Sequence, residues 1–170
     1  STPIKDKNFT FIKKFIGIRT ENNFITLKDW INTSIDISEN NLILQMDIEG
    51  SEYEVLTVES EDTLKRFAII IVEFHNLQGM FDKNFLKMFS SIFEKLYRNF
   101  SICHVHPNNC CGIVTLNGIS IPKVIEVTFV RNNYLDEIKI NESINLPHKL
   151  DCKNIIDIDD IAMPDKWWKF

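Results

Sequence analysis

Three apolar runs in this chain each end in acidic, histidine or amide side chains, and this pattern constrains the fold more than any other feature. The runs fall within residues 42–53, 68–75 and 102–109. An unbroken apolar run is typical of a parallel strand buried on both faces, and open parallel sheets bind ligands outside the carboxyl ends of their strands. The sequence therefore predicts neighbouring strands whose polar ends share one site.

Helical segments separate these strands and predict an alternating α/β fold. Thr26–Asp29 fits a capping box that starts a short helix. Gly50, with Ser51 and Glu54 behind it, predicts a tight turn and a second capped helix. Apolar residues recur at helical spacing through Phe85–Tyr97, which predicts a further helix. The strands of this β-α-β-α-β-β order are expected at 42–48, 68–74, 100–106 and 124–130.

A chain of 170 residues is expected to form one domain with a substantial core. We assign residues 1–140 to this domain and expect Phe9–Ile18 to be extended or a hairpin. Periodicity is lost from residue 141 onward. Residues 141–170 are therefore predicted to form a C-terminal tail that wraps the domain and is pinned by Trp167 and Trp168.

Charge and composition exclude several classes of partner. The net charge is −5 and the basic residues are scattered, which argues against nucleic acid. No apolar run approaches the roughly 18 residues that a membrane-spanning helix needs. Cysteines occur at positions 103, 110, 111 and 152, without the spacing of a zinc site or the density of a disulfide scaffold. We therefore expect reduced thiols in a cytoplasmic protein.

A resemblance to a known family lies mainly in residues 44–56, which read Leu-Gln-Met-Asp-Ile-Glu-Gly-Ser-Glu-Tyr-Glu-Val-Leu. This segment resembles the K-I-D-V-E-G-A-E-x-x-V-L block of the FkbM-type S-adenosylmethionine-dependent methyltransferases. Residues 25–30 are similar to the T-L-D-x-hydrophobic segment of that family, and residues 70–75 fit its following strand. A weaker similarity extends through residues 104–109, 125–130 and 146–154.

The resemblance implies a three-layer, Rossmann-like methyltransferase fold, whose conventional strand order is 3-2-1-4-5-7-6 with an antiparallel seventh strand. The strands of this chain look like the fourth onward. We therefore expect the C-terminal half of the fold, with a mostly parallel sheet and an antiparallel last strand. The glycine-rich cofactor loop of such enzymes follows the first strand, and no pair of the five glycines has its spacing. Either the chain is a piece of a longer protein, or it is a degenerate domain that has lost the chemistry.

By resemblance, the chain belongs to an enzyme that O-methylates a small hydroxylated or sugar-like acceptor, with S-adenosylmethionine as cofactor and Asp47 facing the transferred methyl group. A carboxylate or a histidine can remove the proton of the acceptor. Glu73 and His75 are expected beside Asp47, because adjacent strands lie about 4.8 Å apart. The catalytic candidates are thus Asp47, Glu73 and His75. The acceptor is expected to contact Glu49, His104, His106, Asn108 and Asn109.

The same strand ends are also candidates for a divalent metal site. Residues two apart on a strand point to the same side, so two acids and three histidines are expected to converge. Such ligands suit manganese, iron or zinc, and an ion there could lower the pKa of an acceptor diol. The candidate ligands are Asp47, Glu73, His75, His104 and His106. Alternatively, His104 and His106 only bond nearby asparagines, and Cys110 and Cys111 are buried apolar residues rather than thiolate ligands.

The sequence leaves more than one interpretation open for several residues and for the function. Glu49 and Glu52 either contact the acceptor or lie favourably near a helix N-terminus. Trp30 either stacks on a sugar or packs in the core. A non-catalytic binding module and a metal-dependent hydrolase are alternative functions for the same pocket. An apolar edge at residues 42–48 without a neighbouring strand predicts self-association.

Overall fold

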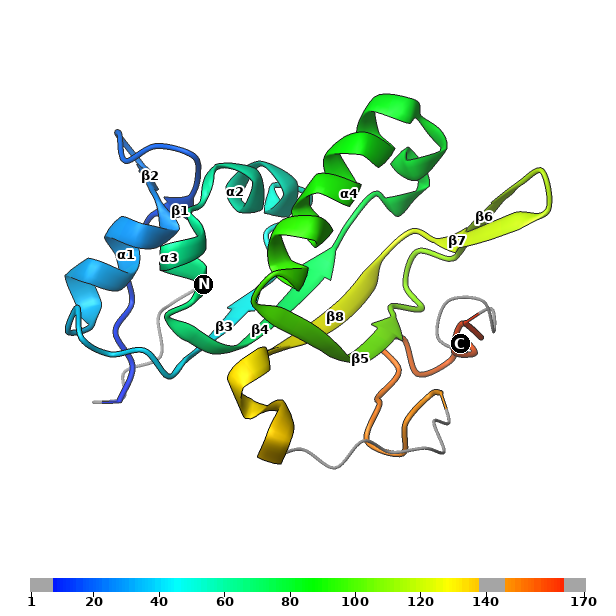
Figure 1. Cartoon of the computed structure of the whole chain (residues 1–170). Helices are drawn as coiled ribbons and strands as arrows, with labels where there is room; N and C mark the ends of the chain where they lie inside the picture. The colour runs from blue at the N-terminus through cyan, green and yellow to red at the C-terminus, as the bar shows by residue number, and fades with distance from the viewer. Residues whose placement is uncertain (1–7, 138–145, 164–170) are drawn as a thin grey trace.

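The computed structural model describes residues 8–137 and 146–163 (Figure 1). None of the described helices combines the length and apolarity needed to cross a membrane. In chain order the elements are β1 (Phe15–Ile16), β2 (Phe24–Ile25), α1 (Leu27–Ser34), β3 (Leu42–Met46), α2 (Glu52–Val58), α3 (Glu61–Leu64), β4 (Phe67–Phe74), the 3-10 helix η1 (Leu77–Phe81), α4 (Lys83–Tyr97), β5 (Phe100–Pro107), β6 (Ile113–Leu116), β7 (Ile119–Pro122), β8 (Ile125–Arg131) and the 3-10 helix η2 (Asn132–Glu137).

Four strands form the main sheet in the order β3-β4-β8-β5. β3 and β4 pair in parallel, whereas β8 is antiparallel to both β4 and β5. The expectation of a mostly parallel sheet is therefore wrong, although the α/β class holds. The reason is that β8 follows β5 through the β6–β7 hairpin instead of a crossover helix and inserts between β4 and β5. β3, β4 and β5 nevertheless run in the same direction.

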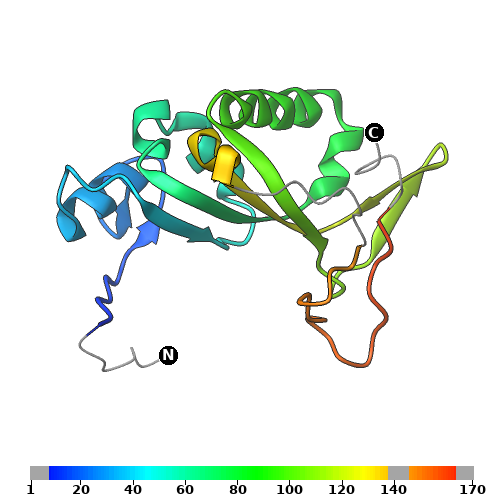
Figure 2. The same ribbon diagram turned by 60° about the horizontal axis from the view of Figure 1, so that its bottom comes forward.

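The apolar core lies between one face of the sheet and the helices α2 and α4 (Figure 2). Ile70, Val72 and Phe74 alternate along β4, point to this face and are completely buried. The ring of Phe74 lies 5.7 Å from that of Tyr53 in α2 and 5.4 Å from that of Phe93 in α4. This packing anchors the end of β4, from which two of the candidate side chains project.

The opposite face of the sheet carries Gln45 of β3 with Ile71 and Glu73 of β4, and none of the described helices covers it. The third layer expected by resemblance is thus missing from residues 8–137 and 146–163. Side chains on this face line a cavity instead of a second core. The strand ends are therefore accessible from the sheet face as well as from the edge.

Helix α1 begins where the sequence predicts, with the Thr26 half of the capping box only, since the Thr26 N–H donates to Thr20 and not to Asp29, and α2 has no side-chain cap. The Oγ1 atom of Thr26 accepts a hydrogen bond from the backbone N–H of Asp29 at 3.1 Å. The Asp29 carboxylate accepts from the hydroxyl of Thr20, which lowers the pKa of Asp29, as does the hydroxyl of Thr26. Ser51 makes no side-chain cap, because its φ of −86° and ψ of 0° are already helical. The expected second capping box is therefore wrong.

The N-terminal segment is extended, and part of the predicted C-terminal tail packs against the core. Phe9–Ile18 contributes β1, which pairs in parallel with β2, so it is extended and not a hairpin. Within the expected tail, residues 146–163 are described, and Met163 is buried with the main core. Trp167 and Trp168 lie outside the described residues.

Strand β3 forms one edge of the sheet, and within the described residues it pairs only with β4. Ile43 on this strand is 65% exposed. An apolar edge of this kind can pair with another chain. Self-association through β3 stays a prediction.

Candidate functional site

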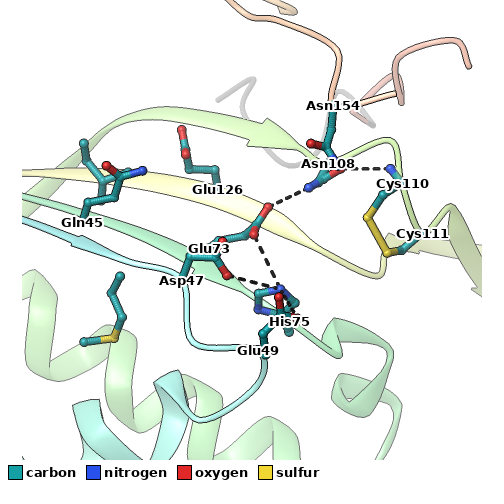
Figure 3. A pocket seen from close by; sticks show the side chains of 12 residues that line it. Gln45, Asp47, Glu49, Glu73, His75, Asn108, Cys110, Cys111, Glu126 and Asn154 are labelled. Carbon is teal, nitrogen blue, oxygen red and sulfur yellow. Dashed lines mark hydrogen bonds and ion pairs between the residues drawn. A yellow bond between two sulfur atoms is a disulfide. The ribbon is translucent and has the colours of Figure 1, made fainter. Parts of the chain in front are cut away.

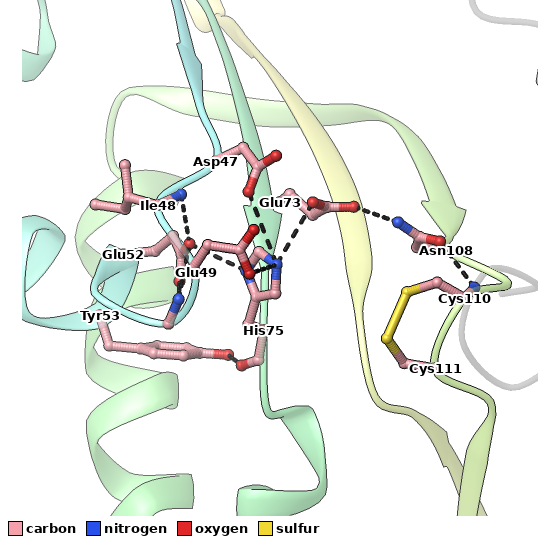
Figure 4. A network of polar contacts seen from close by, with 11 residues as sticks. Asp47, Ile48, Glu49, Glu52, Tyr53, Glu73, His75, Asn108, Cys110 and Cys111 are labelled. Carbon is pink, nitrogen blue, oxygen red and sulfur yellow. Dashed lines mark hydrogen bonds and ion pairs between the residues drawn. A yellow bond between two sulfur atoms is a disulfide. The ribbon is translucent and has the colours of Figure 1, made fainter. Parts of the chain in front are cut away.

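A buried carboxylate holds the turn that follows β3 (Figure 4). Glu52, the first residue of α2, is completely buried and accepts hydrogen bonds from the backbone N–H groups of Ile48 and Gly50, each at 3.0 Å. Glu49 and Gly50 have φ values of 58° and 107°, and Gly50 takes the second of these at no steric cost. Of its two interpretations, Glu52 thus fits the structural one, while the exposed Glu49 carboxylate lies beside His75.

His75, directly after β4, is fixed on two sides. Its Nδ1 atom lies 3.1 Å from Oε1 of Glu52, and its carbonyl oxygen accepts a hydrogen bond from the Tyr53 hydroxyl at 2.5 Å. Because Oε1 of Glu52 already accepts backbone N–H groups, Nδ1 is the donor, and in the neutral ring Nε2 carries the lone pair. Burial, and then the charge of Glu52, raises the pKa of Tyr53, so this hydroxyl stays a neutral donor.

Three more carboxylates surround the Nε2 atom of His75. The nearest oxygens of Glu73, Glu49 and Asp47 lie 3.5, 3.6 and 3.7 Å from it. Asp47, Glu49 and His75 each present one atom able to bind a metal, and these atoms lie within 4.8 Å of one another. The ends of β3 and β4 thus bring the three catalytic candidates Asp47, Glu73 and His75 into one cluster.

The cluster lies in a cavity of about 340 Å³ on the open face of the sheet (Figure 3). Met46 and Ile71 supply apolar lining. None of the lysines or arginines in the described part of the chain lines it, whereas Asp47, Glu49, Glu73 and Glu126 do. The cavity therefore favours neutral or cationic ligands over anions. Further polar groups come from Gln45, Asn108 and Asn154.

Asn108, in the loop after β5, links this loop to Glu73. Its Nδ2 atom donates to Oε1 of Glu73 at 2.7 Å, and its Oδ1 atom accepts from the backbone N–H of Cys110 at 2.9 Å. Cys110 and Cys111 form a disulfide at the rim of the cavity, and Cys111 is exposed. Reduced thiols were expected throughout, which is wrong for this pair but agrees with the free Cys103 and Cys152. Because the sulfur atoms of Cys110 and Cys111 are joined in a disulfide, neither is a thiolate that could bind a metal.

His104 and His106 on β5 do not reach the cluster. The Nε2 atom of His104 lies 2.8 Å from an oxygen of Asp151, and that of His106 lies 3.8 Å from an oxygen of Asp160. Both aspartates belong to residues 146–163. The expectation that three histidines converge with the acids is therefore wrong.

The reason is the position of β8. Glu126 of β8 pairs with Glu73 of β4 on one side and with His106 of β5 on the other. Two strand spacings, or about 10 Å, therefore separate Glu73 from His106 along this row. His106 instead lines a second cavity of about 300 Å³, which shares Glu73, Asn108 and Glu126 with the first.

Asn109, an expected acceptor contact, holds the C-terminal segment instead. It is 3% exposed. Its Nδ2 atom donates to the carbonyl oxygens of Ile155 and Ile158, and its Oδ1 atom accepts from the N–H of Ile155, all at 2.9 Å. Asn109 therefore fastens residues 146–163 beside the cavities and is not placed to bind an acceptor.

We expect Asn109→Ala to loosen residues 146–163. Three hydrogen bonds are lost, each contributing about 0.5–1.5 kcal/mol, so local opening should become roughly tenfold to a thousandfold more frequent. Hydrogen–deuterium exchange of the peptide that covers residues 151–158 measures this change. Asn154→Ala, at an exposed position of the same segment, is the control and should exchange like the wild type. Unchanged exchange in Asn109→Ala would contradict the anchoring role.

Glu126, Gln45 and Asn154 line the cavity but were missed by reasoning from the sequence. Glu126 had a signal, since it is an acid within the apolar run of residues 125–130. Gln45 likewise interrupts an apolar strand. Asn154 lies far from the strand ends in sequence, and nothing local marks it.

Comparison with known proteins gives one family match. The family model of the methyltransferase FkbM domain matches residues 7–99, which is more than half of the 170-residue chain. The chain therefore belongs to the FkbM methyltransferase domain family, as its resemblance predicted. The match contains β3, β4 and the cluster at their ends. No curated protein and no solved structure matches the chain significantly.

Proposed function

We propose that this chain forms the acceptor side of an S-adenosylmethionine-dependent methyltransferase, which methylates a hydroxyl oxygen of a small hydroxylated or sugar-like acceptor. The observation that carries the proposal is the cluster of Asp47, Glu73 and His75 in an open polar cavity. The cluster lies within the part of the chain that the family matches. Family membership supports methyl transfer in general, and the cavity supports the acceptor class.

The strand order is a second line of support. In the conventional methyltransferase order, the fourth, fifth, seventh and sixth strands lie side by side, and the seventh is antiparallel. The main sheet here has the order β3-β4-β8-β5, with β8 antiparallel to its neighbours. This agreement supports the assignment of β3 onward to the C-terminal half of that fold.

The residues of this chain fit the acceptor and not the adenosyl part of the donor. Backbone amides approach such a cofactor through closely spaced glycines, and an acid after the second strand holds its ribose. The glycines here stand singly, at positions 17, 50, 79, 112 and 118. These glycines and their surroundings therefore do not fit the adenosyl group.

On the acceptor side, the cluster can bind a hydroxyl group and take its proton. Asp47 has a side chain that is 52% exposed, at the mouth of the cavity, and is the proposed proton acceptor. Glu73 and His75 support it: Asn108 holds one oxygen of Glu73, and Glu52 fixes the ring of His75. Proton transfer by a positioned side chain contributes typically about 10²–10⁴-fold to a rate.

The other polar groups of the cavity fit a neutral, hydroxylated molecule. The carboxylates of Glu49 and Glu126 can accept hydrogen bonds from hydroxyls, and the amide of Asn108 can donate one to a hydroxyl oxygen. The excess of carboxylates disfavours phosphorylated or carboxylated acceptors. Of the earlier candidates, His104 and Asn109 are engaged by residues 146–163, while His106 lines the adjoining cavity.

The test is a methyl-transfer assay on the complete gene product. With S-adenosylmethionine labelled in its methyl group, we expect labelled methyl ethers from neutral polyols or sugars. Phosphorylated versions of the same sugars should give much less product. Saturable binding of an acceptor without transfer to any hydroxyl would reject the proposal and favour a non-catalytic binding module.

A further inference from the structure

We infer that Asp47, Glu49 and His75 bind a divalent transition-metal cation of the Mn²⁺, Fe²⁺ or Zn²⁺ class. The three residues come from the turn after β3 and the end of β4 (Figure 4). The role of the ion, which is to hold an acceptor hydroxyl, rests on the proposed function. Binding of the ion does not rest on the proposed function, and it can be measured without the methyl donor or the acceptor.

The spacing of the side chains is the first argument. Hydrogen bonds between nitrogen and oxygen span about 2.7–3.2 Å. The oxygens of Asp47 and Glu49 lie 3.7 and 3.6 Å from Nε2 of His75, which is too far for such bonds. Two ligand atoms that each lie about 2.1 Å from one ion, at angles of about 90–110°, are about 3.0–3.4 Å apart. Small rotations of the exposed Asp47 and Glu49 side chains close this difference.

The orientation of the ring is the second argument. His75 is 13% exposed, and the carboxylate of Glu52 at 3.1 Å from Nδ1 takes the proton-bearing side of the ring. The lone pair of Nε2 then faces the carboxylates of Asp47 and Glu49. A carboxylate behind a histidine ring is the usual partner of metal-binding histidines, because it fixes the ring and increases its basicity.

The balance of charge is the third argument. Within the described residues, the ion pairs of Asp47, Glu49 and Glu73 all go to His75. No lysine or arginine among these residues lines the cavity. A nitrogen lone pair that faces several anionic oxygens is repelled by them. A cation at this point, either a metal ion or a proton on Nε2, relieves the repulsion.

The ligand types decide between classes of metal. Imidazole is a good ligand for iron and zinc, and carboxylates also suit manganese, whereas calcium and magnesium prefer sites made of oxygen atoms alone. With the ion bound, Asp47 acts through it. Glu73, which Asn108 holds at 2.7 Å, is then the free carboxylate beside the ion that can accept the proton of a bound hydroxyl.

The experiment titrates Mn²⁺ into the chelator-treated chain and follows free Mn²⁺ by electron paramagnetic resonance. We expect one saturable site. Asp47→Asn and His75→Gln should each weaken it at least tenfold. Glu126→Gln is the matched control, because it removes a carboxylate from the same cavity but not from the cluster, and it should change the affinity less than threefold. Circular dichroism verifies that each variant is folded. If His75→Gln does not fold, Asp47→Asn alone provides the test.

Three results would overturn the inference. Absence of saturable Mn²⁺ binding would reject the metal site. Equal weakening by Glu126→Gln and Asp47→Asn would mean that only the general charge of the cavity attracts the ion. Ca²⁺ that competes as well as Zn²⁺ would argue against imidazole ligation. Methyl transfer that persists in excess chelator would reject the role of the metal alone, whereas metal binding without any methyl transfer would reject the proposed function alone.

Discussion

Glu52→Ala is expected to destabilise the protein by about 3–5 kcal/mol. Three donors lose their common acceptor, namely the backbone N–H groups of Ile48 and Gly50 and the Nδ1 atom of His75. They lie around a side chain with no exposed surface, so water cannot replace the carboxylate without rearrangement. Because small domains are stable by about 5–15 kcal/mol in total, this loss is a large share of the whole. Urea denaturation with linear extrapolation measures it.

Two variants serve as controls for this experiment. Glu52→Gln keeps the shape and one acceptor oxygen, so it should cost about 1–3 kcal/mol, less than the alanine variant. Glu54→Gln neutralises an exposed acid in the same helix and should leave the denaturation midpoint unchanged. If Glu52→Ala unfolds at the wild-type midpoint, the turn after β3 does not depend on this carboxylate.

Asp47→Asn is expected to lower the rate of methyl transfer by about 10²–10⁴-fold in the complete gene product. An amide has the shape of the carboxylate but neither accepts a proton nor binds a cation with full charge. The KM for the acceptor should change much less than kcat, because the amide still forms hydrogen bonds with a hydroxyl. The side chain is 52% exposed, so folding is expected to be preserved.

The matched control is Asp62→Asn. It removes the same charge from an aspartate whose side chain is 95% exposed and which does not line the cavity. Its kcat should equal that of the wild type. A tenfold or larger loss in Asp62→Asn would attribute the effect of Asp47→Asn to net charge, and a fully active Asp47→Asn would remove Asp47 from the reaction.

Local signals predicted most of the elements and part of the cluster. The apolar run before Asp47 and the run before Glu73 and His75 are strands β3 and β4, as their largely apolar content indicated. Both end at the same edge because the two strands are parallel. The spacing of Phe85, Phe89 and Ile92 placed α4, since helical periodicity is a property of neighbouring residues.

The errors concern contacts between distant residues. His104 and His106 have the same strand-end pattern as His75, but β8 separates β5 from β4. Instead of a capping box formed by Ser51 and Glu54, Glu52 holds the turn before α2 by accepting hydrogen bonds from the N–H groups of residues 48 and 50. No local signal could reveal that Asn109 is occupied by residues 155 and 158.

Reading the residues alone was enough to establish that the chain alternates strands and helices, that two strands end in acids and a histidine, and that it resembles the FkbM methyltransferases. These properties depend on the spacing of residues that are near one another in the sequence, and the sequence shows this spacing directly. The folded molecule alone decided that His75 faces Asp47, Glu49 and Glu73 while His104 and His106 face Asp151 and Asp160. That outcome depends on which strand lies beside which, and strand order is set by the packing of the whole sheet.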